Sequence, residues 1–367
     1  MRILLDMRHR NTLSGSVSYI YNVLPHLVGA PSPHEFVVLR YEEQRLPART
    51  DCETVALGTQ SGAVQTVYDQ VLLPKLLRRV GADVYHPLKY LGSTRPSCPQ
   101  VTTLHAITET FRGEFPNRFL ESIYWQHLGR RILHRSSHII AVSAFIGEFL
   151  IERLGMPAER ITVIPHGIDP RFRRLGESEA AAGNPGSQYI LTVGNIFPVK
   201  NFLVAIDVLA ALAVEFPTLR LKMAGATNHA YFNEVRVAAE AAGIADRVDF
   251  LGYVPPEELV LLMNRSRLAL MPSLTEGCPV TLLEAMACGM PVIGSRRGGI
   301  PEIGGDAIVH VDDPHDRPAW VAATRELLCN EEARRRLSAA SLQRVARFSW
   351  ERAAQDTLGV YERTGAR

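Results

Sequence analysis

Two glutamates stand eight residues apart in a segment that otherwise holds mostly small and apolar side chains. They are Glu276 and Glu284, in the stretch SLTEGCPVTLLEAMACGMPVIGS of residues 273–295. Burying a carboxylate is costly unless a partner pairs with it or a ligand uses it. A carboxylate of this kind can accept two hydroxyl hydrogen bonds, as from a ribose. Otherwise they are a capping glutamate and an ordinary helix glutamate.

The elements around these glutamates follow from the same stretch. LALMPS predicts a strand, so residues 273–279 form the loop at its carboxyl end. Pro279 suits a helix start because its missing N–H has no partner there in any case. The helix continues through VTLLEAMA and stops at Gly289, a residue suited to the left-handed position after a helix. Glu276 therefore lies in the loop, and Glu284 about two turns into the helix.

The loop also offers an anion site. The amides around Gly277 and Cys278 lie near the helix N-terminus, where they can bind a group such as a diphosphate. Two carboxylates could instead be the nucleophile and acid of a glycoside hydrolase. That alternative leaves the anion site without a purpose, because a neutral glycoside carries no phosphate.

Strand and helix patterns alternate along the chain, which predicts parallel βαβ units and an α/β fold. Residues 169–188 are polar and rich in Gly and Ala, which is typical of a linker. We therefore expect two doubly wound, Rossmann-like domains, residues 1–168 and 189–345, followed by an amphipathic helix within residues 346–367. Sheets of this kind bind ligands at the carboxyl ends of their strands.

Composition excludes several classes of protein. A net charge of +2 gives no basis for a nucleic-acid partner. The five cysteines show no metal-binding spacing, and the longest apolar run, FLVAIDVLAALAV, is too short to span a membrane. We therefore expect a cytoplasmic protein. No Asp-x-Asp triplet occurs, so no metal is expected, and no GxGxxG follows the first strand, which argues against a nicotinamide cofactor.

Several motifs in order resemble one family. EGCPVTLLEAMACGMPVIGS followed by GGIPEIGGDA resembles the Glu-x(7)-Glu signature of glycosyltransferase family four. ILTVGNIFPVKN, LKMAG and VDFLGYVPPEEL are similar to the family's second-domain landmarks, and FSWERAAQDTLGVY to its terminal helix. The resemblance implies the GT-B fold, with two domains facing a central cleft and the last helix crossing back to the first domain.

The resemblance also implies a retaining transferase that takes a sugar from a nucleotide-diphosphate donor held by the second domain, with the acceptor on the first. By position, His105 faces the sugar, Glu276 contacts it, Glu284 holds the ribose and Lys200 the diphosphate. The nucleobase lies against the stretch 252–254. The implied donor-binding residues are Gly15, Asn195, Lys200, Tyr253, Val254, Gly277, Cys278, Pro279, Val280 and Glu284.

The chain departs from the family pattern at three places. EGCP stands where EGFG is common, with Thr281 where the family has a later proline. Asn195 and Val199 occupy the positions where the usual diphosphate-binding arginine is expected, and Ala106 replaces an aspartate after His105. These losses motivate the alternative of a non-catalytic, sugar-nucleotide-binding or scaffold subunit.

The expected reaction is transfer of a hexose from a GDP- or UDP-sugar to a growing, lipid-linked cell-surface glycan. Mannose is favoured because VGNIFPVKN resembles a segment of bacterial mannosyltransferases. The segment 118–135 carries Arg118, Arg130, Arg131 and Arg135. It could contact anionic lipid at the inner membrane face, or form a solvated helix face. Lone histidines after strands, His9, His86 and His166, are more often structural.

Overall fold

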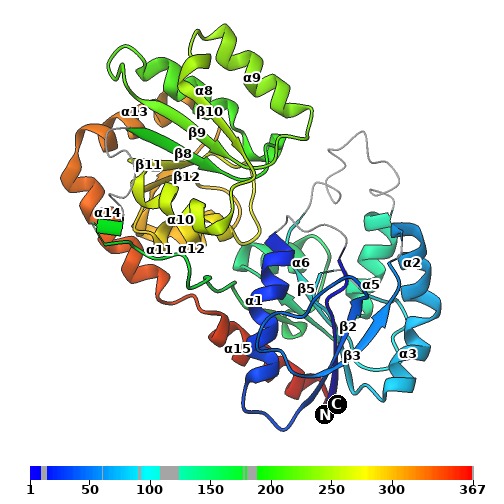
Figure 1. The fold of residues 1–367 in the computed structure, drawn as a ribbon. Coiled ribbons are helices and arrows are strands. Elements are labelled where there is room, and N and C mark those ends of the chain that lie inside the picture. The colour runs from blue at the N-terminus through cyan, green and yellow to red at the C-terminus, as the bar shows by residue number, and fades with distance from the viewer. Residues whose placement is uncertain are drawn as a thin grey trace. The chain divides into compact units, whose positions relative to one another are not determined.

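The computed structural model describes residues 1–9, 15–59, 61–89, 92–107, 124–176, 178–179 and 188–365. The chain divides into two compact units (Figure 1). The first unit contains Met1–Gly167 together with Phe348–Arg367, and the second contains Ile168–Arg347. The segment after Gly167, where the sequence indicates a linker, is therefore counted with the second unit.

The first unit is built on parallel strands. They pair in the orders β3-β2-β1-β4 and β5-β6-β7, and a parallel bridge between Tyr85 and Gln100 links the two sheets. The strands are β1 (Arg2–Asp6), β2 (Glu35–Tyr41), β3 (Glu53–Leu57), β4 (Val84–Pro87), β5 (Val101–Leu104), β6 (His138–Ala141) and β7 (Ile161–Val163). The inner strands are short apolar runs with nearly every residue buried, as expected for parallel strands covered on both faces.

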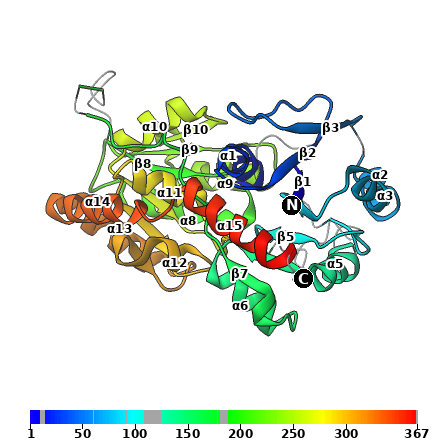
Figure 2. The same cartoon turned by 90° about the horizontal axis from the view of Figure 1, so that it is seen from below.

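Helices connect these strands. They are α1 (Gly15–Gly29), α2 (Gly62–Val71), α3 (Leu73–Val80), the π-helical η3 (Tyr124–Gly129), α5 (Arg130–Arg135), α6 (Ala144–Glu152), the 3-10 turn η4 (Ala158–Arg160) and α15 (Trp350–Gly365). The last helix, α15, packs beside α1, as Figures 1 and 2 both show. Its Trp350 and Tyr361 are buried in the same apolar cluster as Ile3 and Leu24. Gly167 is required here because a Cβ would lie 2.1 Å from the backbone nitrogen of Trp350.

The second unit has a six-stranded parallel sheet in the order β10-β9-β8-β11-β12-β13. The strands are β8 (Tyr189–Val193), β9 (Arg220–Ala224), β10 (Val248–Gly252), β11 (Leu268–Met271), β12 (Val292–Ser295) and β13 (Val309–Val311). The order reverses between β8 and β11, because β8 leads to β9 on one side and β11 to β12 on the other. This reversal is the topological switch point, the place where sheets of this kind bind ligands.

The helices of the second unit pack around that sheet. They are α8 (Leu203–Leu212), α9 (Tyr231–Ala241), α10 (Pro256–Arg265), α11 (Val280–Ala287), α12 (Ile300–Gly304), α13 (Arg317–Cys329) and α14 (Glu331–Val345), with 3-10 turns η5 (Pro198–Lys200), η6 (Ala245–Arg247) and η7 (Gly305–Ala307). The apolar run that is too short to span a membrane forms α8, which packs in the main apolar cluster with Trp320. Gly289 follows α11 at φ +68°, so the predicted helix end is confirmed.

The predicted α/β class with doubly wound parallel sheets is confirmed. No helix in the described part of the chain is both long enough and apolar enough to cross a membrane. Which unit binds the donor and which the acceptor stays a prediction.

Candidate functional site

Loops at the carboxyl edge of the second unit's sheet bring the principal predicted residues together. Lys200 follows β8 and Glu276 follows β11, so they flank the switch point. The Nζ of Lys200 lies 2.6 Å from Oε1 of Glu276. The hydroxyl of Ser273 donates to the same oxygen at 2.7 Å. Both charged side chains are mostly buried, with 19 % of Lys200 and 15 % of Glu276 exposed. The ion pair is therefore better shielded from salt than a surface pair.

Backbone hydrogen bonds fix the Glu276 loop. The amide of Leu274 donates to the Val199 carbonyl at 2.8 Å, which joins the β11 loop to the β8 loop. The amide of Gly299 donates to the Glu276 carbonyl at 2.9 Å. Gly298 has φ +58°, and a Cβ there would lie 2.3 Å from the Glu276 carbonyl oxygen. Only glycine allows this approach, so Gly298 positions Glu276, a role that the sequence did not predict.

Glycines also allow close approach around Lys200. Gly194 has φ +141°, and its Cβ position lies 3.2 Å from the Cε of Lys200. A Cβ on Gly225 would lie 1.8 Å from the Gly194 carbonyl oxygen. The Asn195 side-chain oxygen accepts from the Ala226 amide at 3.3 Å, so it ties these loops together. Its predicted role as a donor ligand stays a prediction.

A second asparagine sets the turn that carries Lys200. Asn201 is buried and adopts a left-handed conformation with φ +53°. Its side-chain amide nitrogen, Nδ2, donates to the carbonyls of Pro272 at 3.2 Å and Pro314 at 2.9 Å. Asparagine tolerates this conformation better than most residues. No role for Asn201 was predicted from the sequence, and the only signal was its place directly after Lys200.

Helix α11 carries the second glutamate. Glu284 is half-buried, and this burial raises its pKa to about 8, with nearby Asp169 raising it further and Arg171 opposing. Arg171 is bound to Asp169 and to Glu257, so it is only partly available to Glu284. The carboxyl of Glu284 is therefore largely protonated at neutral pH in the ligand-free protein. A protonated carboxyl can donate one hydrogen bond and accept others, which suits a pair of hydroxyls.

The other predicted donor residues line the same edge. Cys278 and Pro279 are buried and precede the first turn of α11, while Gly277 and Val280 are half-buried. After β10, the exposed fraction of Tyr253 is 57 %, and Val254 is half-buried. Tyr253 is therefore the most accessible of these positions, and the contacts of all of them with a nucleotide stay a prediction.

His105 lies at the end of β5 in the first unit. Its Nε2 donates to the Leu88 carbonyl at 2.7 Å, which leaves Nδ1, 3.4 Å from Nε2 of His166, as the acceptor. Burial, with a smaller contribution from Lys89, lowers the pKa of His105 to about 4 despite the Leu88 carbonyl. The imidazole is therefore neutral at pH 7, and its role at a sugar stays a prediction.

Two other histidines of this unit, His86 and His166, make structural contacts. His86 bonds to the Tyr361 hydroxyl at 2.5 Å and to Thr103 at 2.8 Å, and burial lowers its pKa to about 3. His166 packs against Trp350, and burial lowers its pKa well below the usual value. Gly15 is exposed at the first residue of α1, and the loop before it lies outside the described residues.

A buried charge cluster after β1 was not predicted from the sequence. The Arg8 guanidinium, which is fully buried, contacts Asp6 at 2.6 Å and Asp69 at 2.7 Å. The Tyr85 hydroxyl donates to Asp6 at 2.8 Å. Burial raises the pKa of Asp69, although Arg8 opposes this shift. The signal was the DMR sequence at the end of a strand, and the cluster holds the start of the loop that leads to Gly15.

The membrane-contact prediction is only partly covered by the structure. Arg118 lies outside the described residues, whereas Arg130, Arg131 and Arg135 are exposed in or at the ends of α5. Among the described residues, no group of three or more His, Cys, Asp or Glu is placed to hold a metal ion. Contact with lipid and independence of metal both stay predictions.

Comparison with known proteins identifies the family. Residues 13–172 match the family model of "Glycosyltransferase Family 4", and residues 177–344 match that of "Glycosyl transferases group 1". The D-inositol 3-phosphate glycosyltransferase of Mycolicibacterium smegmatis is 30% identical over 288 residues, which are 75% of this chain and 64% of that protein. The enzyme of the same name from Segniliparus rotundus is 27% identical over 238 residues, 63% of this chain and 53% of that protein. The chain thus spans between about half and two thirds of these relatives.

Solved structures share the fold at low sequence identity. Sucrose-phosphate synthase from Thermosynechococcus elongatus has a TM-score of 0.78 and 19% identity, with 100% of this chain and 99% of that chain covered. Anabaena Alr3699/HepE in complex with UDP has a TM-score of 0.76 and 17% identity, with 99% and 100% covered. The two family matches, which between them take in both units, and the shared fold show that this chain belongs to the group 1 glycosyltransferases of family four, with the GT-B fold.

Proposed function

We propose that this protein is a retaining hexosyltransferase that uses a nucleoside-diphosphate sugar. The observation that carries the proposal is the Lys200–Glu276 ion pair at the switch point of the second unit's sheet. A cation and a carboxylate side by side match the two charges of the reaction. Negative charge develops on the departing diphosphate, and positive charge develops on the sugar ring.

Lys200 and the amides before α11 are the groups that neutralise the diphosphate. When a phosphate oxygen binds Nζ of Lys200, it competes with Oε1 of Glu276 for the same ammonium. Donor binding thus exchanges one ion pair for another and leaves the Glu276 carboxylate available to the sugar. The bond between the anomeric carbon and the phosphate oxygen breaks, and its electron pair stays on the diphosphate. The acceptor hydroxyl oxygen forms the new bond to the anomeric carbon, and its proton passes to the departing diphosphate oxygen. These protein groups supply positive charge at the diphosphate, so we expect no metal.

Glu284 binds the ribose in this proposal. Its pKa of about 8 keeps the carboxyl protonated before the nucleotide arrives, so Glu284 adds no negative charge to the empty site. Two residues of the segment that begins the second unit also act on this pKa: Asp169 raises it and Arg171 lowers it. The nucleobase lies beside Tyr253 and Val254.

The donor is a GDP- or UDP-hexose. Mannose is favoured by the likeness of VGNIFPVKN to bacterial mannosyltransferases. UDP is supported by a structural neighbour, Anabaena Alr3699/HepE, whose structure is a complex with UDP. His105, neutral at pH 7, acts beside the acceptor in the first unit.

The acceptor is a growing, lipid-linked cell-surface glycan, reached from the cytoplasmic face of the inner membrane with contact through the arginines of α5. The curated relatives favour a second candidate. Their names give D-inositol 3-phosphate as the acceptor, so a phosphorylated inositol belongs in the same assay.

The experiment compares donor consumption by the wild type, Glu276→Gln and Glu326→Gln. Glu326 is an exposed glutamate on α13 of the same unit, so its variant is the matched control. UDP- and GDP-hexoses are supplied with each acceptor class, and released nucleotide is measured. The proposal expects turnover by the wild type and the control, and loss in Glu276→Gln with nucleotide binding retained. Binding without turnover by any of the three proteins would favour the scaffold alternative.

A further inference from the structure

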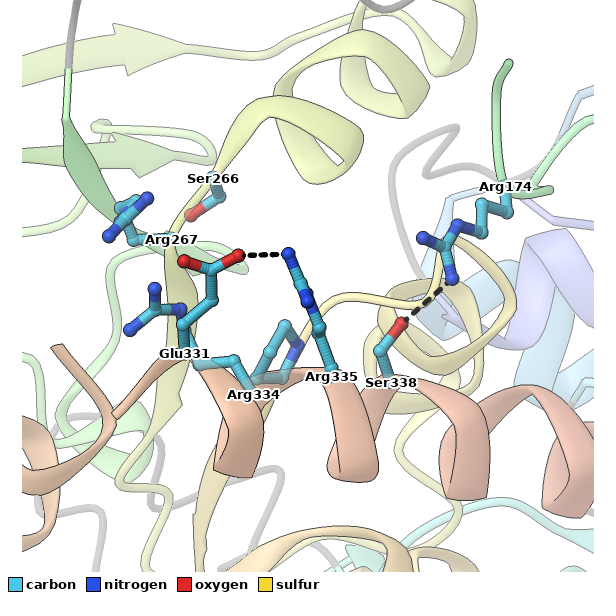
Figure 3. A pocket seen from close by; sticks show the side chains of 8 residues that line it. Arg174, Ser266, Arg267, Glu331, Arg334, Arg335 and Ser338 are labelled. Carbon is cyan, nitrogen blue, oxygen red and sulfur yellow. Dashed lines mark hydrogen bonds and ion pairs between the residues drawn. The ribbon is translucent and has the colours of Figure 1, made fainter. Parts of the chain in front are cut away.

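A cavity of about 510 Å³ lies in the second unit (Figure 3). It lies at the end of the strands opposite Glu276. Arg267 stands directly before β11, whereas Glu276 follows that strand. The rest of the lining comes from α14, from Arg174 in the segment that begins the unit, from Ser266 and from Pro291, which stands directly before β12. We call this cavity the arginine pocket, and its charged and polar residues are Arg174, Ser266, Arg267, Glu331, Arg334, Arg335 and Ser338.

Positive charge in the arginine pocket exceeds negative charge. Four arginines line it against a single lining carboxylate, Glu331, which is bound to Arg335 (Figure 3). Arg174 donates to the neutral hydroxyl of Ser338 at 3.3 Å. The Nε of Arg267 is buried and has no hydrogen-bond partner among the described residues. At least two of these guanidinium groups therefore lack a carboxylate in the part of the chain that the structure describes.

Arg334 adds a buried charge to the same place. Its exposed fraction is 9 %, and its Nη1 donates to the carbonyls of Leu327 and Leu328 at the end of α13. Burial, followed by repulsion from Arg267, lowers the pKa of Arg334. Its hydrogen bonds to the end of α13 give Arg334 a structural role. They do not explain why Arg174 and Arg267 lie at the same pocket.

The backbone that carries Arg174 is held in place. The Leu175 amide donates to the Asn264 side chain at 2.8 Å, and the same side chain donates to the Arg173 carbonyl at 3.0 Å. The turn after α11 closes the other side, because a Cβ on Gly289 would lie 2.8 Å from the Ser338 hydroxyl oxygen and 3.5 Å from Cδ of Arg174. The backbone around Arg174 is thus held in place, whereas the side chains of Arg174 and Arg335 are exposed to solvent.

We propose that the arginine pocket is a second anion site, which binds a compact phosphorylated molecule away from the donor site. Guanidinium groups match phosphate oxygens in geometry and keep their charge when buried. The volume lies within the range of small-molecule sites, roughly 300–1,000 Å³. A free phosphorylated metabolite and the headgroup of an anionic lipid both offer this chemistry.

The test is a calorimetric titration with pyrophosphate. All proteins carry Lys200→Ala, so that the proposed diphosphate contact of the donor site does not contribute. Arg174→Gln and Arg267→Gln each remove one pocket charge. The control, Arg336→Gln, removes an exposed charge of α14 that does not line the pocket. Glu331→Gln removes the lining carboxylate.

The proposal expects pyrophosphate to bind the Lys200→Ala protein and the Arg336 control equally. Binding weakens about tenfold or more in Arg174→Gln and in Arg267→Gln, the scale of a hydrogen bond to a charged group. It tightens in Glu331→Gln, an outcome that a purely structural role for the arginines does not produce. Thermal denaturation of each protein shows that the second unit remains folded.

Vesicles distinguish the two sources of phosphate. The wild type and Arg267→Gln are sedimented with phosphatidylcholine vesicles, with and without phosphatidylglycerol. Retention that needs phosphatidylglycerol and is lost in Arg267→Gln assigns the pocket to a lipid headgroup, and pyrophosphate binding alone assigns it to a soluble ligand. If pyrophosphate fails to bind and vesicle retention does not depend on Arg267, the proposal is wrong. It is equally wrong if pyrophosphate binds all variants alike.

Discussion

Lys200 and Glu276 are 76 residues apart in the sequence, yet their charged groups lie 2.6 Å apart. The pairing arises because the sheet order places β8 beside β11 and both loops leave at the same edge. Each charged side chain would be costly to bury alone, and the ion pair offsets that cost in the ligand-free protein. In the proposal, a phosphate oxygen then replaces the Glu276 carboxylate at Lys200.

Lys200→Ala should weaken binding of UDP or GDP by about 1–3 kcal/mol, the scale of a hydrogen bond to a charged group. Lys200→Arg should recover part of that loss, because it restores the charge with a different shape. Calorimetry with each nucleotide measures both effects. Equal affinity in the wild type and Lys200→Ala would remove Lys200 from the donor site.

Gly298→Ala should reduce transfer by on the order of 100-fold, because the new Cβ would displace the Glu276 loop and small misplacements have effects of that size. Gly243→Ala is the matched control, since Gly243 has φ +66° but no atom within 4 Å of its Cβ position. Both variants carry the same kind of backbone strain, about 1–3 kcal/mol, and only the first meets Glu276. If both lose activity equally, backbone strain rather than Glu276 displacement is the cause.

Glu284→Gln should change how stability depends on pH. The folded-state pKa of Glu284 is raised from 4.5 to about 8, so the wild type is relatively most stable below pH 4.5 and loses stability as pH rises toward 8. The loss is at most about 1.4 kcal/mol per pH unit within that window. The denaturation midpoints of wild type and variant are therefore compared at pH 5 and at pH 8. The midpoint of the variant, relative to that of the wild type, should be higher at pH 8 than at pH 5. Parallel pH profiles would contradict the raised pKa.

His105→Ala should reduce transfer by roughly 100-fold or more while nucleotide affinity stays unchanged, because its unit is proposed to hold the acceptor. The matched control is His26→Ala, an exposed histidine of α1 in the same unit. The rate profile between pH 5.5 and 8 should show no ionisation from His105, whose pKa of about 4 lies below that range. A fall in nucleotide affinity equal to the fall in rate would place His105 at the nucleotide instead.

The sequence predicted features that are local and missed those that depend on distant contacts. The α11 helix, its end at Gly289 and the loop position of Glu276 follow from residue types within one short stretch. The ion pair of Glu276 with Lys200 was not predicted as a contact, because strand order is set by packing of the whole sheet. Gly298 was only part of a recognised motif, since its clash with Glu276 exists only after folding.

The two arginine clusters show the same limit. Arg8 meets Asp69 across 61 residues, and the pocket joins Arg174 to α14 across 164 residues. No local pattern in the sequence indicates either contact. By contrast, the order of strands and helices, which reflects local apolar periodicity, was sufficient to predict the fold class.

The central claim is that the carboxyl edge of the second unit binds a nucleoside diphosphate through Lys200 and Glu284. The most direct test titrates UDP, GDP and ADP into the wild type and Glu284→Ala by calorimetry. The account predicts that one nucleotide binds in the micromolar range and that the variant weakens it by about 1–3 kcal/mol. Absence of binding by all three nucleotides, or equal affinity in both proteins, would contradict it.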